Sequence, residues 1–387
     1  MHLTRDEEKA IKGEYGEYIA SAYRILLAIG EATNAEKLVP IKWAHVAGVN
    51  YNTIGDAGVK FLEEFSKDSR VSVITTLNPM GFDRRRVWDL PSEQFVLNQM
   101  RILKSYEKIG AVPSFTCIPY EVIDIPKRGS VVSVSESNAA VYSNSVLGLL
   151  TNKESALSAL ASSVIGKTPS SDLRINTFRH AKIAIKPTFQ LLTELDYGLL
   201  GYFAGKVATE SCVKFDGLNE NPDLFETKAL CAGIGTSGSC GMFVLDQDRT
   251  SKELILCGNE EINAIKDELN TSEDGNLIAL GSPQFGMHEL NIINNLIEGK
   301  KFTKRCMIFC PKSIYVQATK NGIMNKIEKA GGEFICDSCT CLTPLITREN
   351  ADSVITNSVK AAYYFNNSNK LGVAIKDLKT IMKDYTE

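Results

Sequence analysis

The order of apolar and polar positions along the chain predicts a mixed α/β fold. In the C-terminal third, apolar runs at 276–283, 306–311 and 333–339 alternate with amphipathic stretches such as HELNIINNLIEGK. Near-continuous apolar strands that alternate with helices are typical of a parallel sheet covered on both faces. We therefore expect residues 226–387 to form a doubly wound C-terminal α/β lobe.

The remaining residues, 1–225, are expected to form one or two further α/β lobes that carry substrate loops. Thr4 and Glu7 fit a T-x-x-E capping box at the start of a helix. The segment 71–79 alternates like a strand, and 130–148 predicts a strand, a polar loop at 136–138 and a helix. The segment 197–206 predicts a packed helix interrupted by glycines.

Composition and charge narrow the class of protein. The 387 residues are 44% hydrophobic and 23% charged, with a formal net charge of −3, which is ordinary for a soluble globular protein. This charge gives no electrostatic indication of nucleic-acid or acidic-membrane binding. We find no apolar run long enough to span a membrane, and the charged N-terminus does not resemble a signal peptide. A cytoplasmic protein is expected.

Candidate chemistry lies where the predicted strands end. In doubly wound sheets, ligands bind outside the carboxyl ends of the strands, and these ends carry Ser282, Cys310 and Cys339. Cys339 belongs to a CDSCTC cluster, and Cys117 lies between two prolines in PSFTCIPY. Such cysteines suit an iron–sulfur cluster or zinc. Zinc is disfavoured because the chain has one C-x-x-C pair, Cys336 and Cys339, and lacks a second.

Two further motifs have a structural and a functional interpretation. Gly233, Gly235 and Gly238 satisfy G-x-G-x-x-G, but a strand-like segment follows them, so a glycine-rich turn is expected instead of a dinucleotide site. His45 precedes a predicted loop rich in Gly, Asn and Asp that contains Asp56. A lone histidine is usually structural, yet histidine is also the commonest group for proton transfer.

The chain resembles the aconitase X family through segments that cover nearly its whole length in the order of the family. These segments are GEYGEYIASAYRILLAIG, AHVAGVNYNTIGDAG, TTLNPMGFDRRRVW, SFTCIPY, ESNAAVYSNSVLGLLTNKES, DYGLLGYFAGK, CDSCTCLTP and TNSVKAAYY. The resemblance implies an aconitase-like fold of parallel doubly wound sheets in two or three lobes, lacking the swivelling domain. It also implies a dehydratase that uses an iron–sulfur cluster, [4Fe-4S] or [2Fe-2S], as a Lewis acid.

The family motifs assign cluster ligands to individual positions. Cys117 and Cys339 correspond to two ligands, whereas Ser282 stands where the family has a third cysteine, in a segment that has Gln284 in place of a histidine. Serine is a much poorer iron ligand than a thiolate. Cys310, at the next predicted strand end, is expected to substitute, with Cys341 as the alternative.

The resemblance also suggests catalytic and substrate-binding positions. His45 with Asp56 is expected to protonate the leaving hydroxide. The positions expected to contact a small carboxylate substrate are Asn78, Ser137, Asn138, Asn144, Ser145 and Lys360, and Lys360 is also expected to be catalytic. The superfamily takes its base from a serine on the swivelling domain, and no region of this chain resembles that domain. A small partner subunit that carries the domain is therefore expected.

The substrate and even the activity have alternatives at this point. NPMGFD followed by Trp88 favours the members that act on mevalonate 5-phosphate and consist of two subunits. cis-3-Hydroxy-L-proline is the competing substrate. A cluster-binding or regulatory homologue without catalysis, and a redox protein that uses CDSCTC, are the other two possibilities.

Overall fold

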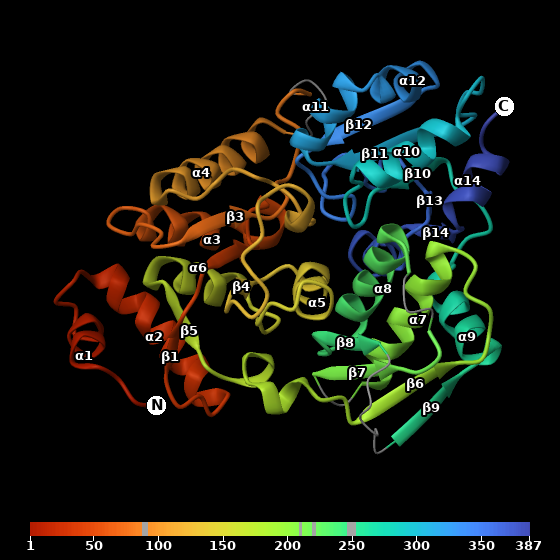
Figure 1. Ribbon diagram of the computed structural model, residues 1–387. Coiled ribbons are helices and arrows are strands. Elements are labelled where there is room, and N and C mark those ends of the chain that lie inside the picture. The colour runs from red at the N-terminus through yellow and green to blue at the C-terminus, as the bar shows by residue number, and fades with distance from the viewer. Residues whose placement is uncertain (87–91, 209–210, 219–221, 246–252) are drawn as a thin grey trace.

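The computed structural model describes residues 1–86, 92–208, 211–218, 222–245 and 253–387. These residues form three sheets of parallel strands and one short antiparallel pair, with helices around and between them (Figure 1). The expected α/β fold with parallel sheets is confirmed. Trp88 lies outside the described residues.

The first sheet lies in the N-terminal part and has the parallel order β3-β2-β4. Its strands, and the antiparallel pair β1–β5, are β1 (Leu38–Pro40), β2 (Trp43–Val46), β3 (Ile74–Leu77), β4 (Ser133–Val134) and β5 (Lys167–Pro169). Its helices are α1 (Arg5–Ile11), α2 (Glu17–Ala32), α3 (Tyr51–Phe65), α4 (Glu93–Ile109), η2 (Pro119–Glu121), α5 (Ser137–Ser145), α6 (Ala156–Ile165), η3 (Asp172–Arg174) and η4 (Asn176–Arg179). Thr4 and Glu7 form the predicted capping box of α1.

In the second sheet, of order β8-β7-β6-β9, the strand-like segment expected after GIGTSG is β8, whereas β6, β7 and β9 were not predicted from the sequence. Its parallel strands are β6 (Ile183–Pro187), β7 (Cys212–Phe215), β8 (Met242–Leu245) and β9 (Glu253–Cys257). Its helices are α7 (Glu194–Val207), α8 (Leu224–Ser237) and α9 (Asn259–Leu269). The lobe boundary expected between residues 225 and 226 is wrong, because it falls inside α8 and would divide this sheet.

The third sheet confirms the doubly wound arrangement expected near the C-terminus. Its five parallel strands have the order β12-β11-β10-β13-β14. They are β10 (Leu277–Leu280), β11 (Arg305–Cys310), β12 (Gly332–Cys336), β13 (Ser353–Thr356) and β14 (Gly372–Ile375). The helices are α10 (Met287–Leu296), α11 (Lys312–Lys320), α12 (Ile323–Lys329), α13 (Val359–Tyr364), the π-helix η5 (Phe365–Asn369) and α14 (Leu378–Asp384).

Helices α5, α7 and α8 occupy the centre of the molecule, between the sheets (Figure 1). The glycines of GIGTSG lie at the C-terminal end of α8, so the expected turn is wrong. A Cβ on Gly233 would lie 2.3 Å from the carbonyl oxygen of Gly198 in α7, and one on Gly235 would lie 2.9 Å from the Ser137 carbonyl carbon in α5. These glycines therefore permit close packing of helix backbones and do not cradle a phosphate.

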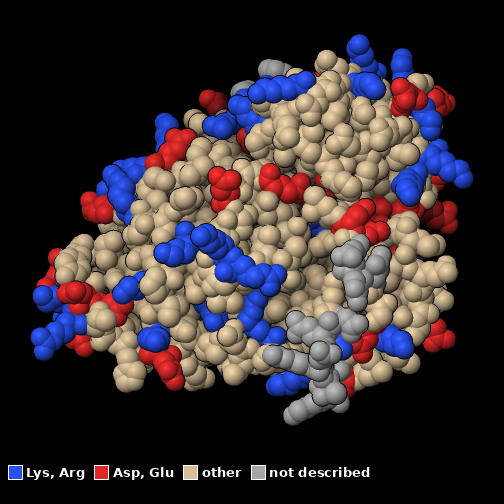
Figure 2. Space-filling view, viewed as in Figure 1, with Lys and Arg blue, Asp and Glu red and all other residues tan. Residues whose placement is uncertain are grey.

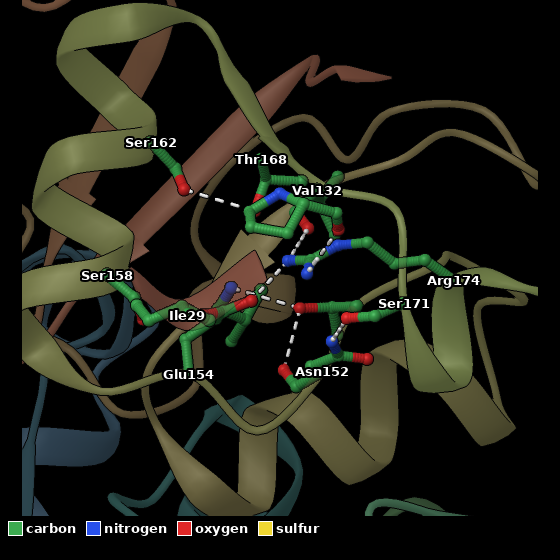
Figure 3. Close-up of polar contacts among 12 residues, drawn as sticks. Ile29, Val132, Asn152, Glu154, Ser158, Ser162, Thr168, Ser171 and Arg174 are labelled. Carbon is green, nitrogen blue, oxygen red and sulfur yellow. Dashed lines mark hydrogen bonds and ion pairs between the residues drawn. The ribbon is translucent and has the colours of Figure 1, made fainter. Parts of the chain in front are cut away.

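A buried ion pair fixes the segment between α5 and α6 (Figure 3). The Arg174 guanidinium pairs with the Glu154 carboxylate, and the side chains are 2% and 6% exposed. Arg174 also donates to the carbonyl oxygens of Val132, at 3.2 Å, and Pro169, at 3.3 Å. Because Val132 directly precedes β4, this network holds the strand that leads into α5.

The surface carries both signs of charge. On the face shown in Figure 2, Lys and Arg side chains gather near the centre, below a row of Asp and Glu side chains. Among the described residues, no helix combines the length and apolar character that crossing a membrane requires.

Candidate active site

The carboxyl ends of the first and third sheets meet at one polar region. Asn78 and Glu136 follow β3 and β4 of the first sheet, and Ser282 and Lys360 follow β10 and β13 of the third. The loop after β12, residues 337–343, completes this region and carries Cys339 and Cys341. Ligands bind at such strand ends in parallel sheets, so the site lies where the fold predicts it.

The Cys117 loop follows α4 and runs beside β3, where the Thr116 N–H donates to the Leu77 carbonyl oxygen at 2.9 Å. Cys117 is 4% exposed. Its sulfur accepts a hydrogen bond from the backbone N–H of Gln284 at 3.2 Å. The proposed ligand Cys117 therefore lies directly against the segment that contains Ser282.

Cys339 and Cys341 lie together in the loop after β12. Their side chains interact with each other, and the Cys341 sulfur is 3.4 Å from the Ser282 hydroxyl oxygen. The Thr340 hydroxyl donates to the Gly281 carbonyl oxygen at 2.8 Å, which anchors this loop to the end of β10. Three thiols from two loops thus surround the segment 282–284.

Gln284 joins these loops through its side chain. Its amide oxygen accepts from the Cys117 N–H at 3.1 Å, and its amide nitrogen donates to the Ser338 carbonyl oxygen at 2.9 Å. The same nitrogen lies 3.4 Å from the carbonyl oxygen of Phe115. Sequence reasoning noted Gln284 only as a departure from the family histidine and missed this positioning role.

Cys310 is not part of this group, and its expected role as third ligand is corrected. Cys310 pairs in register with Cys336 on β12, and their side chains interact with each other. Both pack in the core layer with Ile278, on the opposite face of the sheet from Met307 and Phe309. The strand end was predicted correctly, but alternation along β11 turns the Cys310 side chain away from the site.

A continuous polar chain connects the first sheet to the Cys117 loop. The Asn78 amide donates to one Glu136 oxygen at 2.6 Å, and Lys360 pairs with the other. Lys360 also donates to the Asn138 amide oxygen at 2.8 Å, and Asn138 donates to the Cys117 carbonyl oxygen at 2.9 Å. The structure therefore brings the predicted residues Asn78, Asn138 and Lys360 together.

Glu136 is the functional candidate that sequence reasoning missed. It is the residue before α5 and lies in the predicted polar loop 136–138, but nothing in its spacing indicated a partner as distant in sequence as Lys360. Burial alone would raise the pKa of Glu136, yet the charge and hydrogen bond of Lys360 hold the pKa below its usual value. The pair is therefore ionised at neutral pH.

His45 lies in β2 with no exposed surface. Its Nδ1 is 2.8 Å from the Thr76 hydroxyl and its Nε2 is 2.8 Å from the Asn78 amide oxygen. Burial lowers the pKa of His45 to about 4. The ring is therefore neutral, and it orients Asn78 because Nε2–H donates to the amide oxygen.

The expected pairing of His45 with Asp56 is not found. Residues 51–65 form helix α3 instead of a loop, and Asp56 is exposed on it. Its carboxylate accepts from the Tyr51 hydroxyl at 2.8 Å. The Gly, Asn and Asp residues of this segment suggested a loop, but the Asn50 side chain caps a helix there.

Asn144 and Ser145 make contacts that hold α5 in place, and their expected contact with substrate stays a prediction. The Asn144 amide is engaged with Thr151, Arg179 and Gly241. The Ser145 hydroxyl accepts from the Phe243 N–H at 2.9 Å, which ties α5 to β8. Both lie at the C-terminal end of α5, whereas the half-buried Ser137 begins the helix beside Glu136.

Lys228, a second residue missed in the sequence, is a buried cation behind the thiol loops. Its ammonium is 2.7 Å from Glu121, 2.6 Å from Glu289 and 3.2 Å from the Gln284 carbonyl oxygen. Glu121 follows the Cys117 loop, and Glu289 lies in α10 after the segment 282–284. Lys228 thus holds both segments from α8.

The donor set of this site suits an iron–sulfur cluster. Burial raises the pKa of Cys117 to about 12. The interaction between Cys339 and Cys341 lowers the pKa of Cys339 and, together with burial, raises that of Cys341. The Lys360 charge acts to lower the pKa of all three thiols. Thiolates are the preferred ligands of such clusters. Over the described part of the chain, no three potential ligands are close enough to hold a single metal ion.

Comparison with known proteins matches most of the chain to models of one family, the family that the sequence segments resemble. Family models match residues 1–177 as the aconitase X first domain, 181–261 as the second domain and 275–387 as the third domain. These three regions correspond to the three parallel sheets.

Named relatives match the chain at moderate identity. The phosphomevalonate dehydratase large subunit of Methanocaldococcus jannaschii is 35% identical over 99% of this chain and 100% of its own length. The large subunit from Thermococcus kodakarensis is 33% identical, with the same coverage. The cis-3-hydroxy-L-proline dehydratase of Hypocrea jecorina is 30% identical over 94% of this chain but only 65% of its own length.

A solved structure extends this likeness to the fold. The structure of Thermococcus kodakaraensis aconitase X in its holo-form has a TM-score of 0.92 and 32% identity, with full coverage of both chains. The expected aconitase-like fold is therefore confirmed. Sequence, domain order and structure agree, and the chain belongs to the aconitase X family, whose named members are dehydratases.

Proposed function

We propose that this chain is the large subunit of a dehydratase that removes water from mevalonate 5-phosphate. The observation that carries the proposal is the end-to-end likeness to phosphomevalonate dehydratase large subunits, which the chain matches over 99% of its length. The convergence of three thiols and a buried Lys–Glu pair at facing sheet ends supports it.

In this proposal an iron–sulfur cluster held by cysteines supplies a Lewis acid for the substrate hydroxyl. The chain itself binds and orients the substrate. Lys360 provides a positive charge beside the thiols, which suits an anionic carboxylate. Asn78 and Ser137 provide neutral polar groups at the same strand ends, and the Lys360–Glu136 pair holds the ammonium in place.

His45 has a positioning role in this proposal. Its neutral ring is enclosed, and its two nitrogens lie against Thr76 and Asn78. Because Nε2–H holds the Asn78 oxygen, the Asn78 amide N–H is directed to Glu136. His45 would therefore act through Asn78, and the proton for the leaving hydroxide would come from another group.

The proposal includes a small partner subunit. The relatives that the chain matches end to end are named large subunits, which supports a second chain. We propose that the partner supplies the base that removes the substrate proton, in the manner of the swivelling domain of the superfamily. The ten free cysteines are consistent with a reducing, cytoplasmic location.

cis-3-Hydroxy-L-proline is the second candidate substrate. It is favoured by the Hypocrea jecorina relative, which is 30% identical. That relative is longer than this chain, which covers 65% of it, so the relatives with matched lengths favour mevalonate 5-phosphate.

A direct assay tests the proposal. The chain is purified anaerobically with its small partner subunit, and iron and sulfide are counted. Mevalonate 5-phosphate and cis-3-hydroxy-L-proline are then supplied separately, and loss of one water is followed by mass spectrometry. We expect dehydration of mevalonate 5-phosphate only when both chains are present. Dehydration of hydroxyproline alone would replace the substrate assignment, and a bound cluster without turnover of either would favour a non-catalytic homologue.

A further inference from the structure

The proposed function requires an iron–sulfur cluster, and the residue that provides its third ligand has still to be identified. Cys117 and Cys339 account for two sulfur ligands, and Ser282 lies between their loops with a hydroxyl that is a weak iron ligand. Among the described residues, all ten cysteines of the chain are free thiols. The position of each thiol relative to Ser282 therefore decides which of them can complete the set.

Most of the other thiols face away from the site or belong to other sheets. Cys306, Cys310 and Cys336 pack in the core layer on the far face of the third sheet. In the second sheet, the Cys212 sulfur contacts the Arg179 carbonyl oxygen at 3.7 Å, and the Cys240 sulfur contacts the Met242 carbonyl oxygen at 3.2 Å.

Cys231 and Cys257 are equally unsuited. Cys231 is fully buried within α8, and Cys257 ends β9 at the edge of the second sheet. Neither belongs to one of the loops at the site.

Cys341 occupies the position that the site needs. Its sulfur is 3.4 Å from the Ser282 hydroxyl oxygen, and its thiol interacts with that of Cys339 two residues earlier in the same loop. Cys117 contacts the same segment two residues further on, at the Gln284 N–H. The segment 282–284 therefore has Cys117 on one side and the Cys339–Cys341 pair on the other.

We propose that Cys341 is the third cysteine ligand of the iron–sulfur cluster, and that the Ser282 hydroxyl is a hydrogen-bond donor to its sulfur. The inference rests on the proposed function, since it presupposes a cluster. When a thiol becomes a ligand it gives up its proton to solvent or buffer. The Cys341 sulfur then has no proton to share, and the Ser282 O–H can donate to it.

Ser282 is held ready for this role by its own neighbours. The Ser358 hydroxyl donates to the Ser282 carbonyl oxygen, and the Thr340 hydroxyl donates to that of Gly281. These contacts fix the backbone of Ser282 to both the β13 end and the Cys339–Cys341 loop. Hydrogen bonds to ligand sulfurs stabilise the reduced state of a cluster and so tune its potential.

The test uses the full chain with its partner subunit, reconstituted anaerobically with ferrous iron and sulfide. C117A, C339A and C341A are each expected to lower iron retention by roughly tenfold or more, since even outer-shell changes cost 10–100-fold. C310A is the matched control, a buried cysteine of the same sheet, and is expected to keep the wild-type iron and sulfide content. Far-UV circular dichroism checks that every variant is folded.

A rescue variant separates ligation from packing. S282C/C341A places a new thiol at position 282, next to the position of the lost Cys341 sulfur. It is therefore expected to recover the iron content that C341A loses. In S282A we expect a full cluster whose reduction potential and electron paramagnetic resonance spectrum are shifted. Wild-type iron, sulfide and spectra in C341A would overturn the assignment, and so would a wild-type protein without iron.

The readouts also distinguish this inference from the proposed function. Iron content and spectra report on the ligands without any substrate. If the wild-type complex holds a cluster that is lost in C341A but dehydrates neither substrate, the ligand assignment stands and the dehydratase proposal fails. If the complex dehydrates mevalonate 5-phosphate while C341A keeps its cluster, the dehydratase proposal stands and the ligand assignment fails.

Discussion

The Glu136–Lys360 pair shows what single side chains contribute to this site. Their side chains are only 10% and 8% exposed, and both Asn78 and Asn138 provide further hydrogen bonds to them. A buried charge without its partner is costly, although a complete pair can be close to neutral for stability. The pair therefore matters more for holding the ammonium beside the thiols than for net stability.

The first prediction follows from this asymmetry. Lys360→Met leaves the Glu136 carboxylate buried and uncompensated, and we expect it to lower the free energy of unfolding by about 3–5 kcal/mol. Urea unfolding followed by circular dichroism measures the change. The double variant Lys360→Met/Glu136→Gln removes both charges and should recover a large part of the loss. Equal stability of the single and double variants would show that the charges are not coupled.

Among single residues, the sequence indicated some of those that converge at the candidate site and not others. Cys117, Cys339, Asn138 and Lys360 were predicted because they lie in family segments. Glu136 and Lys228 were not predicted, because a buried charge is recognised by its partner. In the Glu136–Lys360 pair, the two residues are more than a hundred positions apart in the sequence. Cys310 was misassigned because a strand position alone does not say which face the side chain takes.

Among the elements, the central helices α7 and α8 show how glycine permits contact. Gly201 and Gly205 of α7 face the α8 backbone, where Cβ atoms would come within 2.3 Å and 2.8 Å of carbonyl oxygens. Almost every position of α7 from Tyr197 to Gly205 is buried. Helices that are buried all round have no polar face.

Gly233→Ala tests this packing. Its Cβ would lie 2.3 Å from the Gly198 carbonyl oxygen and 2.6 Å from the Tyr202 nitrogen, so the helices must separate. We expect a loss of about 1–3 kcal/mol or more, the usual cost of overpacking. Thermal unfolding with calorimetry measures it.

Gly198→Ala is the matched control on the facing helix. Its Cβ would meet Val359 at an ordinary 3.4 Å, and alanine is the better helix former by about 0.8–1.0 kcal/mol. We expect this control to be neutral or stabilising. If Gly233→Ala and Gly198→Ala change the unfolding temperature equally, the close approach of the helix backbones does not depend on the absence of a Cβ at Gly233.

The same helices explain why most of the second sheet was missed. The segment 197–206 was predicted as a helix, and it lies within α7. Without an amphipathic pattern α8 gave no such signal, and the edge strand β9 has mostly exposed side chains. The third sheet was found because its central strands are fully buried, so their sequences are continuous apolar runs.

On the scale of the whole molecule, one ion triad joins all three aconitase X domains. Glu121 belongs to the first domain, Lys228 to the second and Glu289 to the third. Lys228 is 2% exposed, and its carboxylate partners are 13% and 0% exposed. The buried ammonium of Lys228, close to the cysteine loops, therefore links the second domain to the other two.

Lys228→Met should accordingly weaken the assembly of the domains. Two carboxylates would be left facing each other without a cation, and we expect the free energy of unfolding to fall by at least about 3–5 kcal/mol. Differential scanning calorimetry measures the loss and shows whether one transition becomes several. Lys228→Met/Glu121→Gln/Glu289→Gln is the charge-free control, and it should unfold later than the single variant. A single variant as stable as wild type would contradict the triad as the domain link.

Helix α5 has a consequence for how this enzyme family is probed by mutation. Its nine residues, roughly 13 Å long, carry Glu136 at the N-terminal end and are attached to β8 through Ser145 at the other. The helix therefore acts as a rigid lever between a remote strand and the polar site. We expect a mutational scan scored by turnover to register Asn144 and Ser145, because loosening their end of α5 would displace Glu136, the partner of Lys360 of α13, at the other end. The loss of turnover in such variants would then reflect how firmly α5 is held, and it would act through the displacement of Glu136.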